Sequence, residues 1–283
     1  MATIVFATCR EQPNLQASDK IVADVLQGHG VGVIAAPWNG PFDPFEEADL
    51  IVVRSTWDYA ATPGAFLEWL VRLRACSKVF NDPALMMWNM SKRYMARLRE
   101  GGVPIVPTRF CAPHPRDILA ALDDLGLDEG IVKPVYGAGG SGLSIIRRDD
   151  ADGLRRAVSM LNASAMVQPK LNEITSVGET SLIFIDGLFS HAVLKSPPEG
   201  RILCQEEHGG ASNLVHLDAE TIDMAQSVLD RLPELPLYVR VDAIVTPARF
   251  MIMEVEAIEP ELFFNLAPEQ AHVFAKVLLG RLS

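Results

Sequence analysis

Short apolar runs alternate with amphipathic stretches along the first third of the chain. The runs are short enough for buried strands, and the stretches between them repeat apolar residues at helical spacing. Because strands that alternate with helices form parallel sheets, residues 1–88 are expected to form a doubly wound α/β lobe. The expected strands are Thr3–Ala7, Val31–Ala35, Leu50–Val53 and Lys78–Phe80, and the expected helices are Ser18–Gln27 and Pro63–Arg74.

A second lobe is expected over residues 89–168, where helical and strand patterns are mixed. Gly101-Gly102 and Pro104 end its first helix, because glycine favours a helix C-terminus and proline cannot continue a helix. The expected helices are Ser91–Glu100, Pro115–Leu125 and Asp149–Asn162, and the expected strands are Pro107–Phe110, Gly130–Lys133, Leu143–Arg147 and Ala165–Gln168.

Longer β-runs begin after Pro169 and predict a third lobe over residues 169–283. Asp186-Gly187 separates two of these runs and is typical of a two-residue hairpin turn. The sequence therefore predicts an α/β protein in which α+β lobes follow the doubly wound lobe. The expected strands are Glu179–Ile185, Leu188–Lys195, Leu237–Val245 and Phe250–Ala257, with helices at Ala219–Leu232 and Pro268–Leu282.

Charged residues share one face of the last two predicted strands. Residues two apart in a strand point the same way, so Arg240 and Asp242 share a face, as do Glu254 and Glu256. Carboxylates gathered in a partly buried place repel one another unless a cation lies between them, and magnesium or manganese prefers oxygen ligands. A solvated outer face on which the charges happen to alternate is the alternative.

A glycine-rich segment, Gly137 to Gly142, follows the strand that ends at Lys133. Glycine lets backbone N–H groups approach phosphate oxygens, and the lysine can supply a point charge. The segment lacks the Gly-Lys-Ser/Thr ending of a P-loop, and the strand that follows it argues against a Rossmann turn. It is predicted to be a flap that closes over a triphosphate, with a mobile hairpin tip that binds no ligand as the alternative.

Taken together, these segments resemble the ATP-grasp superfamily, which includes D-alanine–D-alanine ligase, glutathione synthetase and biotin carboxylase. The resemblance covers about residues 89–260 and implies the ATP-grasp fold, and residues 1–88 resemble the domain that precedes it in the family. It rests on the order of Lys92 in a helix, Lys133 before the flap, the linker Gln168-Pro169-Lys170-Leu171, Arg240-x-Asp242 and Glu254-x-Glu256.

The resemblance implies that one set of residues binds ATP. The two lysines would contact the α- and β-phosphates, the flap would cover the β- and γ-phosphates, the linker would hold the adenine, and a glutamate would bind the ribose hydroxyls. Glu179 and Glu173 compete for this last role. The full set is Lys92, Lys133, Gly139, Gly140, Ser141, Gln168, Lys170, Leu171, Glu179 and Glu173.

The resemblance also implies a catalytic and a metal-binding set. Lys195 would reach the γ-phosphate, and Arg240 would stabilise the charge that develops during phosphoryl transfer. Asp242, Glu254 and Glu256 would bind Mg²⁺ or Mn²⁺. Many family members have Asn at the position of Glu256, so the extra charge here is expected to tighten metal binding.

A polar and aromatic cluster, Arg54-Ser55-Thr56-Trp57-Asp58, follows the predicted strand Leu50–Val53. Ligands of parallel sheets lie beyond the carboxyl ends of the strands, so this cluster is predicted to form the acceptor pocket. Arg54 is suited to hold a substrate carboxylate in a bidentate pair, while Trp57 and Asp58 could shape the pocket or bind an amine. An N-cap and turn, with Ser55 or Thr56 as the cap, is the alternative.

Two further segments are assigned to the acceptor side. Arg201 and residues 205–210 are expected to form a mobile loop over the acceptor, and Glu259 is expected near the reaction centre. Together with the Arg54 cluster, Gly178-Glu-Thr-Ser and Glu254-Val-Glu are similar to the branch that contains the D-cycloserine-forming cyclo-ligase, which closes a ring on an O-ureido-serine.

The implied function is that of an ADP-forming ligase. It would phosphorylate a carboxylate or carbonyl of a small molecule and join it to an amine, either of a second molecule or of the same one. Two alternatives stay open: a kinase-like phosphotransferase, and an ATP-binding regulatory protein without turnover. The combination of Arg240 with three carboxylates argues against the last, because a binding module has little need of a metal-held transfer site.

The composition limits which binding partners and which cellular compartment are expected for the protein. The 36 acidic residues outnumber the 25 Lys and Arg residues, and the net charge of −11 disfavours nucleic acid and anionic membranes as partners. The four cysteines form no C-x-x-C pair, which fits a reducing compartment. The apolar run at Ile4–Ala7 is too short for a signal peptide. A cytoplasmic protein with a small-molecule substrate is expected, with a homodimer as one option.

Overall fold

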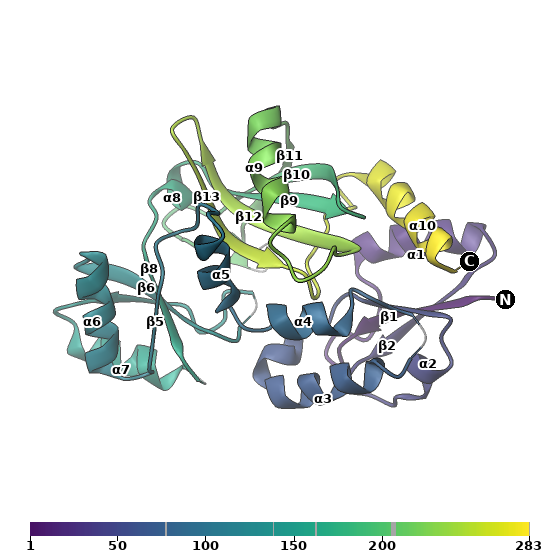
Figure 1. Cartoon of the computed structure of the whole chain (residues 1–283), viewed down its shortest axis with the longest axis horizontal. Helices are drawn as coiled ribbons and strands as arrows, with labels where there is room; N and C mark the ends of the chain where they lie inside the picture. The colour runs from purple at the N-terminus through teal and green to yellow at the C-terminus, as the bar shows by residue number, and fades with distance from the viewer. Residues whose placement is uncertain (77, 138, 162, 205–207, 283) are drawn as a thin grey trace.

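Figure 1 shows the computed structural model, which describes residues 1–76, 78–137, 139–161, 163–204 and 208–282. The first sheet has the strand order β2-β1-β3-β4, and all of its pairings are parallel. This confirms the predicted α/β lobe. Its strands are β1 (Thr3–Thr8), β2 (Gly32–Pro37), β3 (Leu50–Val53) and β4 (Val79–Phe80), and its helices are α1 (Ala17–Gly28), α2 (Asp43–Glu46), η1 (Trp57–Ala61, a 3-10 helix) and α3 (Pro63–Leu73).

Both faces of the first sheet are covered, because alternate residues of its strands point to opposite sides. Ile4 and Phe6 of β1 pack in the core that contains Val22 and Leu26 of α1. Val5 and Ala7 pack in a second core with aromatic residues such as Phe66 of α3. The sheet is therefore doubly wound, as its apolar strands predict.

The second sheet is antiparallel, has the order β5-β8-β6-β7 and carries its own helices and core, around residues such as Leu122 and Val132 (Figure 1). The flap segment connects β6 to β7, as predicted. The elements are β5 (Arg109–Cys111), α6 (Pro115–Leu125), β6 (Glu129–Pro134), β7 (Ser144–Arg147), α7 (Ala151–Ser159) and β8 (Ala165–Pro169).

The third sheet is also antiparallel and has the order β11-β10-β9-β12-β13. Asp186 and Gly187 form the predicted two-residue turn, and both have positive φ, as a type I′ turn requires. The elements of this region are α8 (Glu173–Ser176), β9 (Glu179–Ile185), β10 (Leu188–Ser196), β11 (Ala211–Val215), α9 (Ala219–Leu229), β12 (Tyr238–Thr246), β13 (Arg249–Glu256) and α10 (Pro268–Leu282).

The third sheet packs on the first lobe through a shared core. Ile183 and Tyr238 on one face of the third sheet meet Phe6 and Leu50 of the first sheet, and Phe274 of α10 packs in the same core. The opposite face of the third sheet is covered by α9 and by α5 (Tyr94–Glu100). The first and third sheets thus share one core, whereas the second sheet encloses its own.

One predicted helix is replaced by two. The helix expected at Ser91–Glu100 begins only at Tyr94 and is preceded by α4 (Pro83–Asn89). Lys92 was expected in a helix; this is wrong, because it lies in the turn between α4 and α5, where its N–H donates to the carbonyl of Val135 at 3.0 Å. That turn brings Lys92 against the strand that feeds the flap. None of the helices in the described residues is long and apolar enough to span a membrane.

Asn81 connects the first sheet to the third. Its side-chain Nδ2 donates to the carbonyls of Tyr238 and Ala257, both at 2.8 Å, and its Oδ1 accepts from the N–H of Leu237 at 2.7 Å. Asn81 is almost fully buried. Its amide therefore satisfies backbone groups around the start of β12 and just after β13.

We predict that Asn81→Leu lowers the free energy of unfolding by roughly 3 to 5 kcal/mol, because several buried backbone groups lose their partner at once. Chemical denaturation of the purified variant measures this. Asn213→Leu on the exposed edge strand β11 is the matched control and should change the stability by less than about 0.5 kcal/mol. Equal losses in both variants would contradict this role of Asn81.

Candidate active site

A cavity of about 690 Å³ lies between the three sheets. The second lobe contributes the flap residues Gly139, Gly140 and Ser141, and the third sheet contributes charged side chains of β12 and β13. From the first lobe come Trp57 and the segment around the start of α1. Residues from all three predicted lobes therefore meet in one site.

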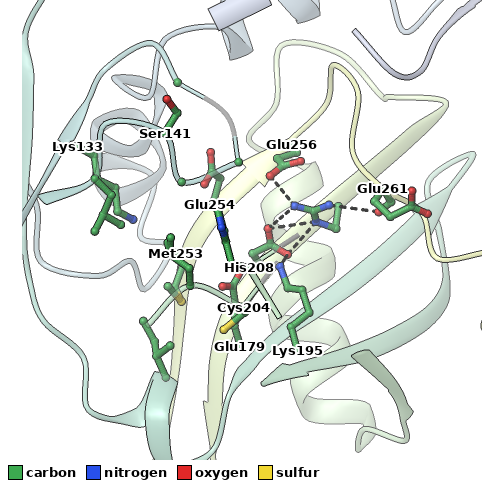
Figure 2. A pocket seen from close by; sticks show the side chains of 18 of the residues that line it. Lys133, Ser141, Glu179, Lys195, Cys204, His208, Met253, Glu254, Glu256 and Glu261 are labelled. Carbon is green, nitrogen blue, oxygen red and sulfur yellow. Dashed lines mark hydrogen bonds and ion pairs between the residues drawn. The ribbon is translucent and has the colours of Figure 1, made fainter. Parts of the chain in front are cut away.

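Charged side chains of the third sheet form a connected network along one wall of the cavity (Figure 2). Arg240 lies opposite Glu256 and Asp242 lies opposite Glu254 in the β12–β13 pairing. The Arg240 guanidinium donates to Asp242 at 3.0 Å and to Glu256 at 2.5 Å. The predicted sharing of a face by these residues is thus confirmed. The face is not a solvated outer one, because Arg240 and Asp242 are buried and the two glutamates are half-buried.

Lys195 extends this network to β9 and β10. Its Nζ donates to Glu179 Oε1 at 2.8 Å and to Asp242 Oδ1 at 3.3 Å. Asp242 also accepts a hydrogen bond from Ser181. Burial alone would raise the pKa of Asp242, but Arg240 and Lys195 lower it below its ordinary value, so this carboxylate stays ionised.

Two lysines of the site differ in their pairing. Lys92 forms an ion pair with Glu254, and this pairing raises its pKa despite its burial. Lys133 forms no ion pair with any residue that the structure describes, and burial lowers its pKa below the ordinary lysine value. Lys133 is therefore available to an anionic ligand, whereas Lys92 must first leave Glu254.

Two carboxyl groups of the site, Glu256 and Glu259, have raised pKa values. Burial, together with the neighbouring Asp242 and Glu254, raises the pKa of Glu256 to about 8, although Arg240 opposes the shift. Burial raises the pKa of Glu259 to about 7. The charged forms of both groups are thus disfavoured where they lie, chiefly because burial removes water from them.

An apolar slot adjoins the charged wall. Val106, Leu171 and Met253 belong to one small apolar cluster and also line the cavity, as does Ile131 of β6. Gln168 lines the slot, while its Nε2 donates to Thr108 Oγ1 at 2.9 Å. Apolar walls with a few polar groups at the edge are typical of sites for planar ligands.

The chain is similar to ATP-grasp ligases along its whole length. Residues 4–81 match the family model of the N-terminal domain of D-cycloserine synthetase DcsG. The cycloserine biosynthesis protein DcsG of Streptomyces lavendulae is 29% identical over 269 residues, which cover 89% of this chain and 90% of that protein. The crystal structure of D-cycloserine synthetase DcsG superposes with a TM-score of 0.86 at 25% identity and covers all of both chains. The chain is therefore similar to DcsG over nearly its whole length.

Two more distant structures share the fold of this chain. ATP-grasp ligase PsnB, complexed with minimal precursor, Mg and ADP, has a TM-score of 0.65 at 16% identity, over 99% of this chain and 98% of PsnB. D-alanine–D-alanine ligase from Bacillus anthracis, complexed with ATP, has a TM-score of 0.66 at 16% identity, over 98% of this chain and 95% of that enzyme. The predicted ATP-grasp fold is therefore confirmed.

Most of the residues assigned to ATP line the cavity. Of the two candidate ribose ligands, Glu179 lines the cavity, whereas Glu173 does not and pairs with Arg249 at 2.7 Å. Ala138 of the flap lies outside the described residues. The assigned residues that line the cavity are Lys92, Lys133, Gly139, Gly140, Ser141, Gln168, Lys170, Leu171, Glu179, Lys195, Arg240, Asp242, Glu254 and Glu256.

The three expected metal ligands are neighbours, but each is paired with a cation or shares one. Asp242 and Glu256 share Arg240, and Glu254 pairs with Lys92. Within the described ranges, no three His, Cys, Asp or Glu side chains lie close enough together to hold a metal ion. The metal site therefore stays a prediction, and metal binding would require at least one of these ion pairs to open.

The predicted acceptor cluster lies mostly outside the cavity. Arg54 is buried and its Nε donates to Asp19 at 2.8 Å, so the carboxylate that it holds belongs to this chain. Asp58 accepts hydrogen bonds from Trp38 at 2.5 Å and Asn39 at 2.7 Å. Ser55 and Thr56 are buried and do not line the cavity. Within the cluster only Trp57 reaches the cavity.

The loop expected over the acceptor contributes only in part. Ile202, Leu203 and His208 line the cavity, but Arg201 is exposed and does not. Residues 205–207 lie outside the described residues. Glu259 lines the cavity, as predicted.

Several cavity residues were missed by the sequence reasoning. Gln12 and Gln16 follow β1, and Ser18 begins α1. The same rule that pointed to the end of β3 applies to the end of β1 and could have found them. Cys204, Met253, Glu261, Phe263 and Asn265 also line the cavity, and no local pattern marks them.

Gly178 fixes the start of β9 next to Glu179. Its φ of +104° lies in a region that side chains rarely adopt, and a Cβ at this position would meet the carbonyl oxygen of Lys195 at 2.6 Å. Glycine is therefore required where β9 passes β10, beside the pair of Glu179 and Lys195.

We predict that Gly178→Ala lowers the free energy of unfolding by roughly 2 to 4 kcal/mol, from backbone strain and the clash with β10. Thermal or chemical denaturation measures the loss. Gly200→Ala separates the two causes, because Gly200 has a φ of +74° with nothing within 4 Å of the added Cβ, and it should cost only about 1 kcal/mol. A similar loss in both variants would rule out the clash as a cause.

Proposed function

We propose that this ligase uses ATP and a divalent cation to phosphorylate a carboxylate or carbonyl oxygen of a small molecule and then forms a carbon–nitrogen bond within that molecule, with release of ADP and phosphate. The observation that carries the proposal is the convergence of Lys92, Lys133, Lys195 and Arg240 on one cavity beneath a glycine-rich flap. The similarity to DcsG over nearly the whole chain supports the cyclising form of the reaction.

ATP fits the cavity by chemistry. The apolar slot around Leu171 and Met253 suits the adenine ring, and Glu179 at its edge can accept hydrogen bonds from ribose hydroxyls. Lys133 makes no ion pair within the part of the chain that the structure describes. It lies at the end of the strand before the flap, where a phosphate would gain a charge-assisted contact. Gly139, Gly140 and Gly142 have positive φ, a conformation that opens backbone N–H groups to phosphate oxygens.

A hard divalent cation also fits the residues present. Asp242, Glu254 and Glu256 offer only oxygen donors, as Mg²⁺ and Mn²⁺ prefer. Burial and mutual repulsion raise the pKa of Glu256, so a cation near this group would relieve an existing cost. When bound, such an ion would neutralise phosphate charge during transfer.

The proposed reaction has two steps, and residues of the chain stabilise charge in the first. In the first step the bond between the γ-phosphorus and the ADP oxygen breaks, and a bond to the substrate oxygen forms, while Arg240 and Lys195 stabilise the charge on the transferring group. In the second step a nitrogen of the substrate attacks the activated carbon, loses a proton, and displaces inorganic phosphate. No covalent bond to the protein is needed.

Incubation of the purified protein with ATP, Mg²⁺ and O-ureido-serine tests the proposal, with a panel of amino acids and hydroxamates alongside. ADP, free phosphate and a cyclised product should appear together. ADP with a stable phosphorylated product and no free phosphate would favour a kinase. Tight ATP binding without acceptor-stimulated ADP release across the panel would overturn the ligase proposal.

Glu254→Gln should abolish this turnover and leave the fold intact, because the carboxylate would serve the cation rather than the core. Product analysis and circular dichroism measure the two effects. Glu68→Gln on the exposed face of α3 is the control and should be fully active. Normal turnover by Glu254→Gln at limiting Mg²⁺ would remove Glu254 from the metal site.

Lys133→Ala should weaken ATP binding by roughly 1.5 to 3 kcal/mol, the usual contribution of a contact to a charged group. Calorimetric titration of the variant with ATP measures the loss. Lys276→Ala on the exposed side of α10 removes the same charge from the protein and should leave the affinity unchanged. An equal affinity in a folded Lys133→Ala variant would place Lys133 outside the phosphate site.

A further inference from the structure

Alternate residues of the loop between β13 and α10 form part of the cavity wall. Glu259, Glu261, Phe263 and Asn265 line the cavity. The residues between them point elsewhere: Leu262 and Phe264 are fully buried in the core shared by the first and third sheets. The loop therefore presents one edge to the cavity in the way that an extended strand does.

Four successive carbonyls of this loop each accept a hydrogen bond from a different side chain. An irregular segment has no ladder to satisfy its carbonyls, so side chains from other elements must do so. Two donors come from the first lobe and two from the third sheet. The pairs are Trp57 Nε1 with Glu259 O (3.1 Å), Arg54 Nη2 with Pro260 O (3.0 Å), Arg240 Nη1 with Glu261 O (3.3 Å) and His191 Nε2 with Leu262 O (2.9 Å).

His191 contacts the loop through the Leu262 carbonyl and does not line the cavity. A carbonyl can only accept, so Nε2 carries the proton, while Nδ1 lies 2.9 Å from Ser190 Oγ. Burial lowers the pKa of His191 below its ordinary value, and the ring is therefore neutral at neutral pH. The donor that holds Leu262 is thus fixed in place on β10.

The loop needs these anchors because its backbone is strained. Phe263 has a φ of +54°, a conformation that is costly for a residue with a Cβ. The residues on its N-terminal side are held by Arg240 and His191, and its own N–H donates to Glu261 Oε1 at 2.8 Å. On its C-terminal side the N–H of Asn265 contacts Ser18 Oγ at 3.3 Å. The surrounding contacts thus hold Phe263 in the conformation that turns the loop along the cavity.

We propose that Arg54 and His191 are positioning residues for the acceptor: they hold the carbonyls of Pro260 and Leu262 so that Glu259, Glu261, Phe263 and Asn265 form the wall against which the acceptor binds. The proposal rests on the proposed ligase function for the identity of the acceptor. It gives Arg54 a role in substrate binding that needs no contact with substrate, since its own carboxylate partner is Asp19.

His191→Leu and His191→Gln test the proposal, because His191 lies outside the cavity and Gln keeps an N–H donor. In His191→Leu the amides of residues 259–265 should exchange hydrogen at least about tenfold faster, and the KM for O-ureido-serine should rise about tenfold with a smaller change in kcat. ATP affinity, measured by calorimetry, should stay within about twofold. His191→Gln should restore most of the exchange protection and of the KM.

Phe189→Leu is the matched control, because it truncates a partly buried ring of the same strand that packs in the opposite core. Unchanged loop exchange and an unchanged KM in His191→Leu, or the same losses in Phe189→Leu, would overturn the inference. If His191→Leu does not fold, Trp57→Phe removes one anchor while keeping a ring, and loop exchange is compared with Trp69→Phe, whose indole N–H has no partner in the described structure.

The two proposals fail in different ways. If wild-type protein does not turn over O-ureido-serine, the proposed function fails, and the exchange comparison still decides whether the anchors hold the loop. If the wild type is active but the loop exchange of His191→Leu is normal, only the positioning inference fails.

Discussion

The buried charge of Asp242 is the constraint around which the third sheet and the cavity are organised. A carboxylate without water must be compensated, and it is shared here by Arg240, Lys195 and Ser181. These partners come from β12, β10 and β9. Because these side chains must all reach the same carboxylate, the relative register of the three strands is fixed. The carboxylate also holds two cations at the cavity wall in defined orientations, before any ligand arrives.

The same network links the third sheet to the first lobe through one loop. Arg240 donates to Glu261 O as well as to Asp242, so the charged wall is bonded to the β13–α10 loop. Arg54 and Trp57 bond that loop to the first lobe. By contrast, the second lobe meets the site through the flap and the apolar slot. Movement of the second lobe away from the other two would open the site and break few buried contacts. Separation of the first and third sheets would instead break their shared core.

The sequence was sufficient for the elements that periodicity specifies. The alternation in β12 and β13 predicted that Arg240 would share a face with Asp242, and Glu254 with Glu256, because a strand leaves no other choice. It could not predict the β-bulge between Asp242 and Ala243, which needs the partner strand. Nor could it predict that Arg54 finds Asp19, 35 residues away, or that the Lys92 turn lies against Val135. Local patterns fix which face a side chain takes, whereas long-range packing decides its partner.

Helix α10 is synthesised long after the first sheet, with which it packs. Its residues Phe274 and Leu278 complete the core on one face of the first sheet, whose strands begin at Thr3. During synthesis the first lobe therefore emerges with that face covered only in part, by α1, and the remainder stays uncovered until α10 is made. An apolar sheet face exposed for that long is a target for chaperones and for aggregation. The core on this face of the first lobe is thus complete only after α10 has been made.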